Sequence, residues 1–207
     1  MSTPILLFAI AVSSLLQILA DARKQFPLTY IFKPLVLVLI IVLATQTPIM
    51  GNPRRWAIIA GLLFSLAGDI FLMLRERRFL AGLVSFLAAH LCYCVAFFHP
   101  PDVSLSITAL PIFAAGAVFY RLLAPGLHRL KIPVLVYLVF VLAMVTLAIH
   151  QWILHPSVHT GVTALGASLF VVSDALLALR EFRKAFPWSQ KAILLTYFAA
   201  QTCIAWG

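Results

Sequence analysis

Long apolar runs separated by short polar gaps follow one another along the whole chain. Charges, prolines or polar clusters bound eight such runs, at residues 4–20, 34–50, 56–74, 79–98, 103–120, 132–149, 161–179 and 190–206. The runs are continuous, whereas a membrane-spanning β-barrel would show alternating segments of about ten residues. Each run approaches the roughly 20 apolar residues that a membrane-spanning helix requires. The pattern predicts an all-α membrane protein with eight transmembrane helices in a single transmembrane domain, residues 1–207.

The composition indicates a membrane protein rather than a soluble one. Hydrophobic residues make up 63% of the chain and charged residues 10%, against about 45–50% and about 25% in soluble domains. The net charge is +9, but the basic residues lie in the gaps between apolar runs, where they would orient the protein in the bilayer. Nucleic acid is therefore not an expected partner. Ala20-Asp21-Ala22 is similar to a signal-peptide cleavage site, but no basic residue precedes the first run, which favours a first membrane helix.

Lysine and arginine gather in alternate gaps, which predicts the orientation of the chain. The gaps after the first, third, fifth and seventh runs contain 13 of the 15 basic residues: Arg23, Lys24, Lys33, Arg75, Arg77, Arg78, Arg121, Arg129, Lys131, Arg180, Arg183, Lys184 and Lys191. The other two, Arg54 and Arg55, follow the second run. Because positive loops stay in the cytoplasm, both termini are expected on the non-cytoplasmic side. The expected location is the inner membrane of a bacterium or the endoplasmic reticulum of a eukaryote.

A repeat is visible at an offset of 105 residues. Residues 61–78 match residues 166–183 at several positions, among them Gly61/Gly166, Asp69/Asp174, Arg75/Arg180 and Glu76/Glu181. A weaker similarity links Lys33-Pro34 with Lys131-Ile132-Pro133. The repeat predicts two four-helix halves, about 1–100 and 101–207, that run in the same direction and are related by an axis along the membrane normal. Asp69 and Asp174 would then lie at the same depth.

The two aspartates are the first candidates for chemistry. Each lies six residues before an arginine that ends its predicted helix, about 9 Å below the cytoplasmic boundary. A carboxylate in hydrocarbon costs about 2.5–3.5 kcal/mol on insertion scales, so both should face the interior. Each could simply be neutral or paired with an arginine and hold helices together, but the recurrence favours a functional role. Two adjacent carboxyl groups resist ionising together, which would give one acid and one base, although a proton relay fits equally well.

Further polar residues extend this layer, and each has a structural interpretation as well. Lys33, at the start of the second predicted helix, is either a snorkelling lysine or a charge partner for an aspartate or a lipid phosphate. His90 is expected near the midplane, with Tyr93 three residues further along the chain. It either lines the site or makes a structural hydrogen bond. Tyr197 and Gln201 share a helix face at the depth of the aspartates, as site lining or as interhelical polar contacts.

Histidines and cysteines do not indicate a metal site. His150, His155 and His159 are spaced by five and four residues, but no acidic residue lies nearby to complete a ligand set, and a histidine-rich interfacial loop accounts for them. The cysteines, Cys92, Cys94 and Cys203, have no disulfide or zinc spacing and are interpreted as small hydrophobic residues. No metal and no cofactor is expected.

Five short motifs occur in order along the eight predicted helices. They are Lys33-Pro34-Leu35, Phe64-Ser65-Leu66-Ala67-Gly68-Asp69, His90-Leu91-Cys92-Tyr93, Phe170-Val171-Val172-Ser173-Asp174 and Thr196-Tyr197-Phe198-Ala199-Ala200-Gln201. In these motifs the chain resembles the YhhN-like integral membrane family, whose characterised members are lysoplasmalogenases. The resemblance implies hydrolysis of the vinyl ether bond at the sn-1 position of a lysoplasmalogen, which releases a fatty aldehyde and a glycerophospho-base.

The resemblance and the residues together define a candidate site. Asp69 and Asp174 are the expected catalytic acid and base. The expected supporting or substrate-binding residues are Lys33, Ser65, His90, Tyr93, Ser173, Tyr197 and Gln201. The expected partner is a lysolipid from the cytoplasmic leaflet, whose head group would lie against the basic residues on that side.

A different class of function is also compatible with the sequence. Parallel repeats and intramembrane carboxylates are equally natural in a small-solute or lipid transporter that couples transport to protons. Prolines and glycines do not interrupt paired helices at the midplane in both halves, which favours the hydrolase. Because a transporter needs a sealed membrane and an enzyme does not, activity in detergent separates the two.

Overall fold

The computed structural model describes residues 2–46, 52–74, 78–98, 103–184 and 186–207, and these residues are almost entirely helical. Its α-helices are α1 (Thr3–Ala22), α2 (Phe26–Ala44), α3 (Pro53–Met73), α4 (Phe79–Phe97), α5 (Val103–Leu123), α6 (Lys131–Leu154), α7 (Val158–Phe182) and α8 (Ser189–Trp206). Two short 3-10 turns, Ala124–Gly126 and His128–Leu130, join α5 to α6. The described ranges contain no strand, so the all-α prediction is confirmed for them.

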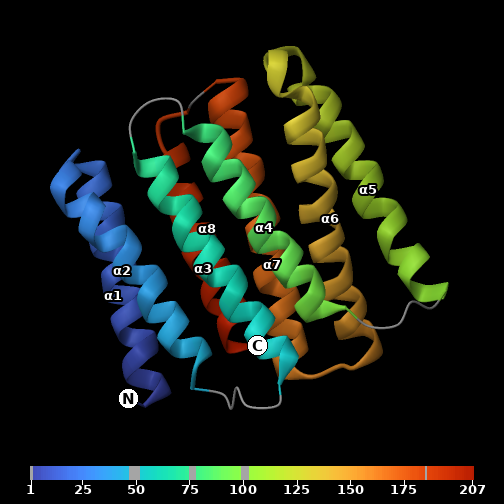
Figure 1. The fold of residues 1–207 in the computed structure, drawn as a ribbon, viewed down its shortest axis with the longest axis horizontal. Coiled ribbons are helices and arrows are strands. Elements are labelled where there is room, and N and C mark those ends of the chain that lie inside the picture. Colours follow the sequence, from blue (N-terminus) through green and yellow to red (C-terminus); the bar gives the residue numbers. More distant parts are fainter. Residues whose placement is uncertain (1, 47–51, 75–77, 99–102, 185) are drawn as a thin grey trace.

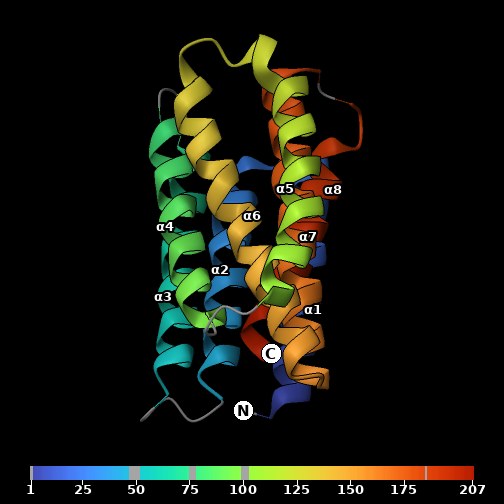
Figure 2. The same cartoon turned by 90° about the vertical axis from the view of Figure 1, so that its right-hand side faces the viewer.

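The helices form one elongated bundle in which they run side by side (Figure 1). Six of them close a ring, because α2 packs on α3, α3 on α4, α4 on α6, α6 on α7, α7 on α8 and α8 on α2. The other two lie outside this ring at its opposite edges, with α1 against α2 and α8 and with α5 against α6. The start of α1 and the end of α8 lie at the same end of the bundle (Figure 2).

Seven of the described helices, α1 to α7, are long and apolar enough to cross a membrane. The chain is therefore a multi-pass membrane protein. Large apolar side chains on the outside of the bundle are strongly exposed, such as Phe8, Leu110 and Ile132, each more than 70% exposed, as expected for surfaces that face lipid. The last helix, α8, is less apolar because it carries Gln190, Lys191 and Gln201, so the eighth crossing stays a prediction.

The second helix begins eight residues earlier than the sequence pattern predicts. The apolar run 34–50 suggested a start at Lys33-Pro34, but α2 begins at Phe26 with a proline, Pro27, in its first turn. Proline suits the first turn of a helix, where its missing N–H needs no partner. The helix then continues through Pro34, although this residue cannot donate to the carbonyl four positions earlier. Lys33 therefore lies two turns inside the helix and not at its start.

Glycines allow α3 and α4 to approach closely. A Cβ atom at Gly61 would lie 2.3 Å from Cε1 of Tyr93, and one at Gly68 would lie 2.7 Å from Cε2 of Phe86. Small residues of this kind commonly set the distance between membrane helices, because lipid supplies no hydrophobic force to hold the helices together. The aromatic rings of α4 thus occupy space that side chains of α3 would otherwise fill.

We expect Gly61→Ala to lower the free energy of unfolding by about 1–3 kcal/mol, because the added methyl group overlaps the Tyr93 ring. Thermal unfolding of the purified protein in detergent measures this loss. A double-mutant cycle supplies the control, since Gly61→Ala should cost little in a Tyr93→Ala background where the ring is absent. Equal costs in both backgrounds would contradict the proposed contact.

Candidate functional site

Six side chains, one from each helix of the ring, form two polar groups inside the bundle. They are Lys33 of α2, Asp69 of α3, His90 of α4, Tyr137 of α6, Asp174 of α7 and Tyr197 of α8. Counted along their helices, they lie about 6–16 Å from the same end of the bundle. At this end α1, α3, α5 and α7 finish and α2, α4, α6 and α8 begin (Figure 1). Each polar group is built around one aspartate.

Asp69 is buried and has a partner for each carboxylate oxygen. The ammonium of Lys33 lies 2.9 Å from Oδ1, and the hydroxyl of Tyr197 donates to Oδ2 over 2.9 Å. Only 3% of the Asp69 side chain and 13% of the Lys33 side chain are exposed. Of the two interpretations of Lys33, the charge partner is therefore the one that the structure shows.

The early start of α2 makes this ion pair possible. Lys33 is seven residues from the first residue of α2 and Asp69 is four residues from the last residue of α3. Because α2 and α3 run in opposite directions, these positions lie about 10 Å and about 6 Å from the same end of the bundle. A lysine at the first residue of α2 would lie nearer the end of the bundle than the Asp69 carboxylate, and not beside it.

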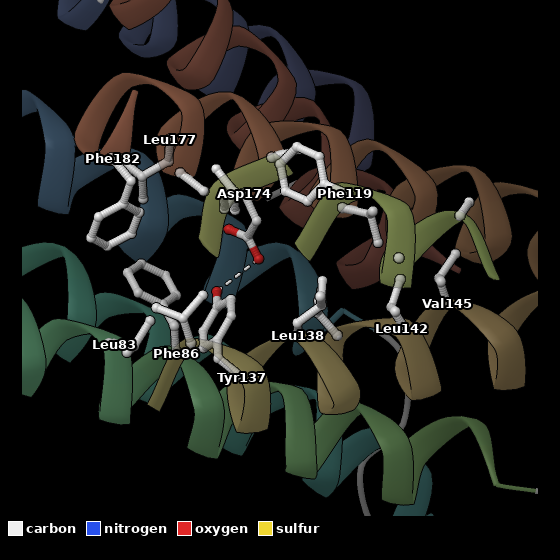
Figure 3. Close-up of a pocket in the computed structure, with 18 of the residues that line it drawn as sticks. Leu83, Phe86, Phe119, Tyr137, Leu138, Leu142, Val145, Asp174, Leu177 and Phe182 are labelled. Carbon is white, nitrogen blue, oxygen red and sulfur yellow. Dashed lines mark hydrogen bonds between the residues drawn. The ribbon is translucent and has the colours of Figure 1, made fainter. Parts of the chain in front are cut away.

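Asp174 has different partners. The hydroxyl of Tyr137 donates to its Oδ2 over 2.7 Å, as Figure 3 shows. Nε2 of His90 lies 3.6 Å from the same oxygen, which is too far for a hydrogen bond. Among the described side chains no lysine or arginine forms an ion pair with Asp174, whose side chain is 15% exposed. Asp174 is thus the more accessible aspartate and has no cation beside it comparable to Lys33.

His90 is completely buried between aromatic rings. Its ring packs edge-to-face on Tyr137 and Phe170, with centroid distances of 5.0 and 4.8 Å. Neither ring nitrogen has a hydrogen-bond partner within the described part of the chain. Buried polar atoms are nearly always paired, so an unpaired imidazole 3.6 Å from a carboxylate indicates a position that a proton or a ligand can use.

Both aspartates line one polar cavity of about 390 Å³. Lys33 and Tyr197 contribute to its wall beside Asp69, and Ser173 contributes beside Asp174. At its outer end the cavity is lined by Arg78, Arg180, Glu181 and Gln190. The structure therefore brings together the two carboxyl groups that the repeat singled out, and it places basic side chains between them and the end of the bundle.

A second cavity of about 410 Å³ adjoins the first and is almost entirely apolar. It lies mainly between α4, α5, α6 and α7, and Asp174 points into it (Figure 3). Five residues line both cavities: Leu72, Phe79, Phe86, Asp174 and Leu177. Asp174 is the one ionisable residue among these five.

The remaining predicted site residues lie around the aspartates in different ways. The Tyr93 hydroxyl donates to Oε1 of Gln201 over 2.7 Å, which links α4 to α8. Ser173 donates to the backbone carbonyl of Ile193 over 3.2 Å. Ser65 is fully buried one turn before Asp69, and its hydroxyl has no partner in the described ranges. Of these four, only Ser173 lines the polar cavity.

The structure does not bring the three histidines of the α6–α7 region to the aspartates. His159 stacks on Trp206 with a centroid distance of 4.8 Å, and His150 is buried in α6. In the part of the chain that the structure describes, no three residues of the His, Cys, Asp and Glu types are grouped as a metal site would require. The arginine Arg75 and the acid Glu76, used in the sequence repeat, lie outside the described residues.

Sequence reasoning missed Tyr137. The signal was present, because Tyr137 is a tyrosine six residues inside an otherwise apolar run, away from the interfaces where tyrosine is usual. Tyrosine is common enough in helices that only its contact with Asp174 identifies it.

We expect Lys33→Met to destabilise the protein by about 3 kcal/mol, because it leaves a buried carboxylate without its cation. Adding Asp69→Asn to this variant should restore most of the loss, since the uncompensated charge is then gone. Thermal unfolding in detergent measures both effects. Lys191→Met removes an exposed lysine of α8 and is the matched control. An additive double variant would contradict the ion pair.

Comparison with known proteins finds relatives along nearly the whole chain. The model of the YhhN family matches residues 28–207. The membrane protein YhhN of Escherichia coli O6:H1 is 28% identical over 198 residues, which cover 95% of this chain and 94% of that protein. Lysoplasmalogenase TMEM86A of Homo sapiens is 32% identical over 167 residues, 76% of this chain and 67% of that protein. A lysoplasmalogenase of Mycobacterium tuberculosis is 31% identical over 185 residues, 85% of this chain and 68% of that protein. No solved structure matches significantly. This chain belongs to the YhhN family.

Proposed function

We propose that this protein is a membrane hydrolase that cleaves the vinyl ether bond of a lysoplasmalogen, using Asp69 and Asp174 as base and acid. The observation that carries the proposal is that the two aspartates line one cavity and have different partners, an ammonium for Asp69 and a phenol for Asp174. Relatives from human and from M. tuberculosis that are named lysoplasmalogenase support the substrate class.

Vinyl ether hydrolysis needs one proton donor and one proton acceptor. A proton adds to the β carbon of the alkenyl chain, and the α carbon and ether oxygen share the resulting positive charge. Water then adds to the α carbon and gives a proton to a base. The hemiacetal so formed breaks its carbon–oxygen bond to glycerol, which yields the fatty aldehyde and the free hydroxyl of the glycerophospho-base. A carboxylic acid and a carboxylate at suitable positions provide general acid and general base catalysis for these steps.

The partners of the two aspartates suggest which is which. The ammonium of Lys33 stabilises the negative charge of Asp69, so Asp69 is the carboxylate that accepts the proton of the attacking water. An ionised Asp174 would have no such cation, and the apolar surroundings favour its neutral form. Asp174 is therefore the proton donor. A carboxylate at Asp69 also stabilises the positive charge that develops on the substrate.

Tyr137 and His90 act on Asp174. The phenol of Tyr137 fixes the carboxyl group by a hydrogen bond to Oδ2. His90, whose nitrogens have no hydrogen-bond partner among the described residues, is close enough to return a proton to Asp174 after a small movement. On this proposal Tyr137 is a positioning residue and His90 restores the acid for the next turnover.

The finer topology is also part of the proposal. We infer eight crossings in two parallel repeats, with both termini on the non-cytoplasmic side. Corresponding helices of the two halves have corresponding neighbours, because α4 packs on α6 as α8 packs on α2. Each aspartate is contacted from its own half and from the other, Asp69 by α2 and α8 and Asp174 by α6 and α4. A two-fold axis along the membrane normal accounts for both observations.

The lipid would come from the cytoplasmic leaflet. Arg78 and Arg180 line the outer end of the polar cavity, at the end of the bundle that the distribution of basic residues assigns to the cytoplasm. A phosphate group there would be attracted by both guanidinium groups and would keep the glycerol near Asp69.

We expect Asp69→Asn and Asp174→Asn each to reduce aldehyde release from a synthetic lysoplasmalogen by about a hundredfold or more, the usual contribution of a general acid or base. The assay uses protein purified in detergent, where transport across a membrane cannot produce a signal. Asp21→Asn, at the end of α1, and Tyr120→Phe, whose hydroxyl donates to the backbone carbonyl of Lys131, are matched controls and should retain activity. Full activity of either site variant would refute the paired-carboxyl mechanism, and no aldehyde from the natural sequence would favour a transporter.

Cysteine labelling tests the orientation. In a variant whose Cys92, Cys94 and Cys203 are replaced by alanine, we expect His155→Cys to react with a membrane-impermeant thiol reagent in intact cells. Lys184→Cys should react only after the membrane is opened, because the basic connections face the cytoplasm. The reverse pattern would place the polar cavity at the opposite leaflet and leave the proposed chemistry unchanged.

A further inference from the structure

The apolar cavity beside Asp174 is larger than the chemistry of two carboxyl groups requires. It measures about 410 Å³, and its lining is apolar except for Tyr137, Ser168 and Asp174. The Ser168 hydroxyl donates to the carbonyl of Ala164 over 2.8 Å, so it offers the cavity little polarity. The polar part of the lining is therefore confined to the place where Tyr137 meets Asp174 (Figure 3).

The length of the cavity matches one lipid chain. Along α6 its lining extends from Val134 to Ile149, and the part between Tyr137 and Ile149 lies on one side of Asp174. Twelve residues of helix correspond to about 18 Å. The hydrocarbon core of a bilayer is about 30 Å thick, so a chain that reaches its midplane is about 15 Å long. The cavity can accept a single extended chain along most of its length.

The order of the two cavities matches the order of groups in the proposed substrate. Asp174 lies partway along the apolar cavity, whose lining continues to Phe182 of α7 in one direction and to Ile149 of α6 in the other. Asp174 also lines the polar cavity, whereas Asp69 lines only the polar cavity. In a lysoplasmalogen the groups follow one another in the order hydrocarbon chain, β carbon, α carbon, ether oxygen, glycerol and phosphate. With the chain in the part of the apolar cavity between Asp174 and Ile149, the β carbon lies at Asp174, and the α carbon follows on the side of Asp69. This is the order that an acid at Asp174 and a base at Asp69 require.

One wall of the apolar cavity is built by α5, the helix outside the ring. Ile112, Gly116 and Phe119 of α5 contribute to this wall. A Cβ atom at Gly116 would lie 2.2 Å from Cδ1 of Leu142, so glycine lets α5 pack closely on α6. A closely packed α5 limits the size of the cavity, and its volume of about 410 Å³ suits a lipid with one chain better than a lipid with two.

We infer that the cavity between α4, α5, α6 and α7 binds the hydrocarbon chain of a single-chain lipid, with its reactive end at Asp174, and that Val145 marks the depth at which chain length is selected. The inference rests on the proposed function for the identity of the reactive end. Val145 is 5% exposed, lines the cavity, and is eight residues, or about 12 Å, from Tyr137. A larger side chain there shortens the space available to a chain.

The test compares Val145→Phe with the natural sequence on a hexadecenyl and a decenyl lysoplasmalogen. We expect kcat/KM to fall about tenfold or more for the hexadecenyl substrate and to change less than about twofold for the decenyl substrate, since excluding a few methylene groups from an apolar pocket has effects of this size. Val139→Phe is the matched control, because Val139 is 42% exposed on the outer face of the same helix and should alter neither substrate. Equal losses for both chain lengths, or none for either, would overturn the inference.

A binding measurement separates this inference from the proposed hydrolysis. The probes are saturated hexadecyl and decyl ether lysophosphatidylcholines, which have no vinyl group, and their binding to the full chain in phosphatidylcholine nanodiscs is measured. Selective loss of hexadecyl binding in Val145→Phe supports the chain site even if no vinyl ether is cleaved. Hydrolysis that is insensitive to the substitution, with unchanged binding, refutes the chain site and leaves the hydrolase intact.

Photocrosslinking covers the case in which Val145→Phe does not fold. A hexadecyl lysophosphatidylcholine with a diazirine at the chain end should label residues 112–116 of α5 or 141–149 of α6 in the natural sequence. Labelling restricted to the outer faces of α1 and α2 would place the chain in the surrounding lipid and overturn the inference.

Discussion

The structure depends on one constraint, that a carboxylate inside an apolar bundle must have a partner. Asp69 meets this requirement through Lys33 at 2.9 Å and Tyr197 at 2.9 Å. These partners come from α2 and α8, which close one side of the ring. Helix α2 has to begin at Phe26 and continue through Pro34 to carry the lysine to the depth of the carboxylate. The helix boundary, the closure of the ring and the charge of the site are therefore linked, because leaving the carboxylate unpaired would cost several kcal/mol.

The two aspartates hold matching positions in the chain but have unlike surroundings. Each contacts one residue from a neighbouring helix of its own half and one from the other half. Asp69 has the ammonium of Lys33 and the phenol of Tyr197, whereas Asp174 has the phenol of Tyr137 and the imidazole of His90 nearby. A repeat alone would produce two similar carboxyl groups. A lysine beside one aspartate and none beside the other makes the two carboxyl groups electrostatically different, and the proposed acid and base catalysis depends on such a difference.

The two cavities that meet at the aspartates differ in polarity. The polar cavity carries Arg78 and Arg180 at its outer end, and the apolar cavity extends away from Asp174 along α6. An amphiphile with one chain fits this arrangement in one orientation, because reversing it would place a phosphate among leucine and valine side chains at a large desolvation cost. The helix outside the ring, α5, contributes to the apolar wall and to none of the contacts with the aspartates. Helices α4, α6 and α7 line the apolar cavity and also carry His90, Tyr137 and Asp174.

The sequence by itself determined the helical class and the positions of most helices, because continuous apolar runs are local patterns, and it singled out Asp69 and Asp174 by the similar residues around them. It also placed Tyr197 and Gln201 on one face of the last helix, and both do face the interior. The predicted start of α2 was wrong by eight residues, since the sequence cannot show whether a helix passes through a proline or begins at it. Tyr137, the choice of Lys33 as the partner of Asp69, and the apolar cavity were decided by tertiary structure. Each depends on which helices become neighbours and at what depth their side chains meet, and those distances between helices are set by packing that no single segment encodes.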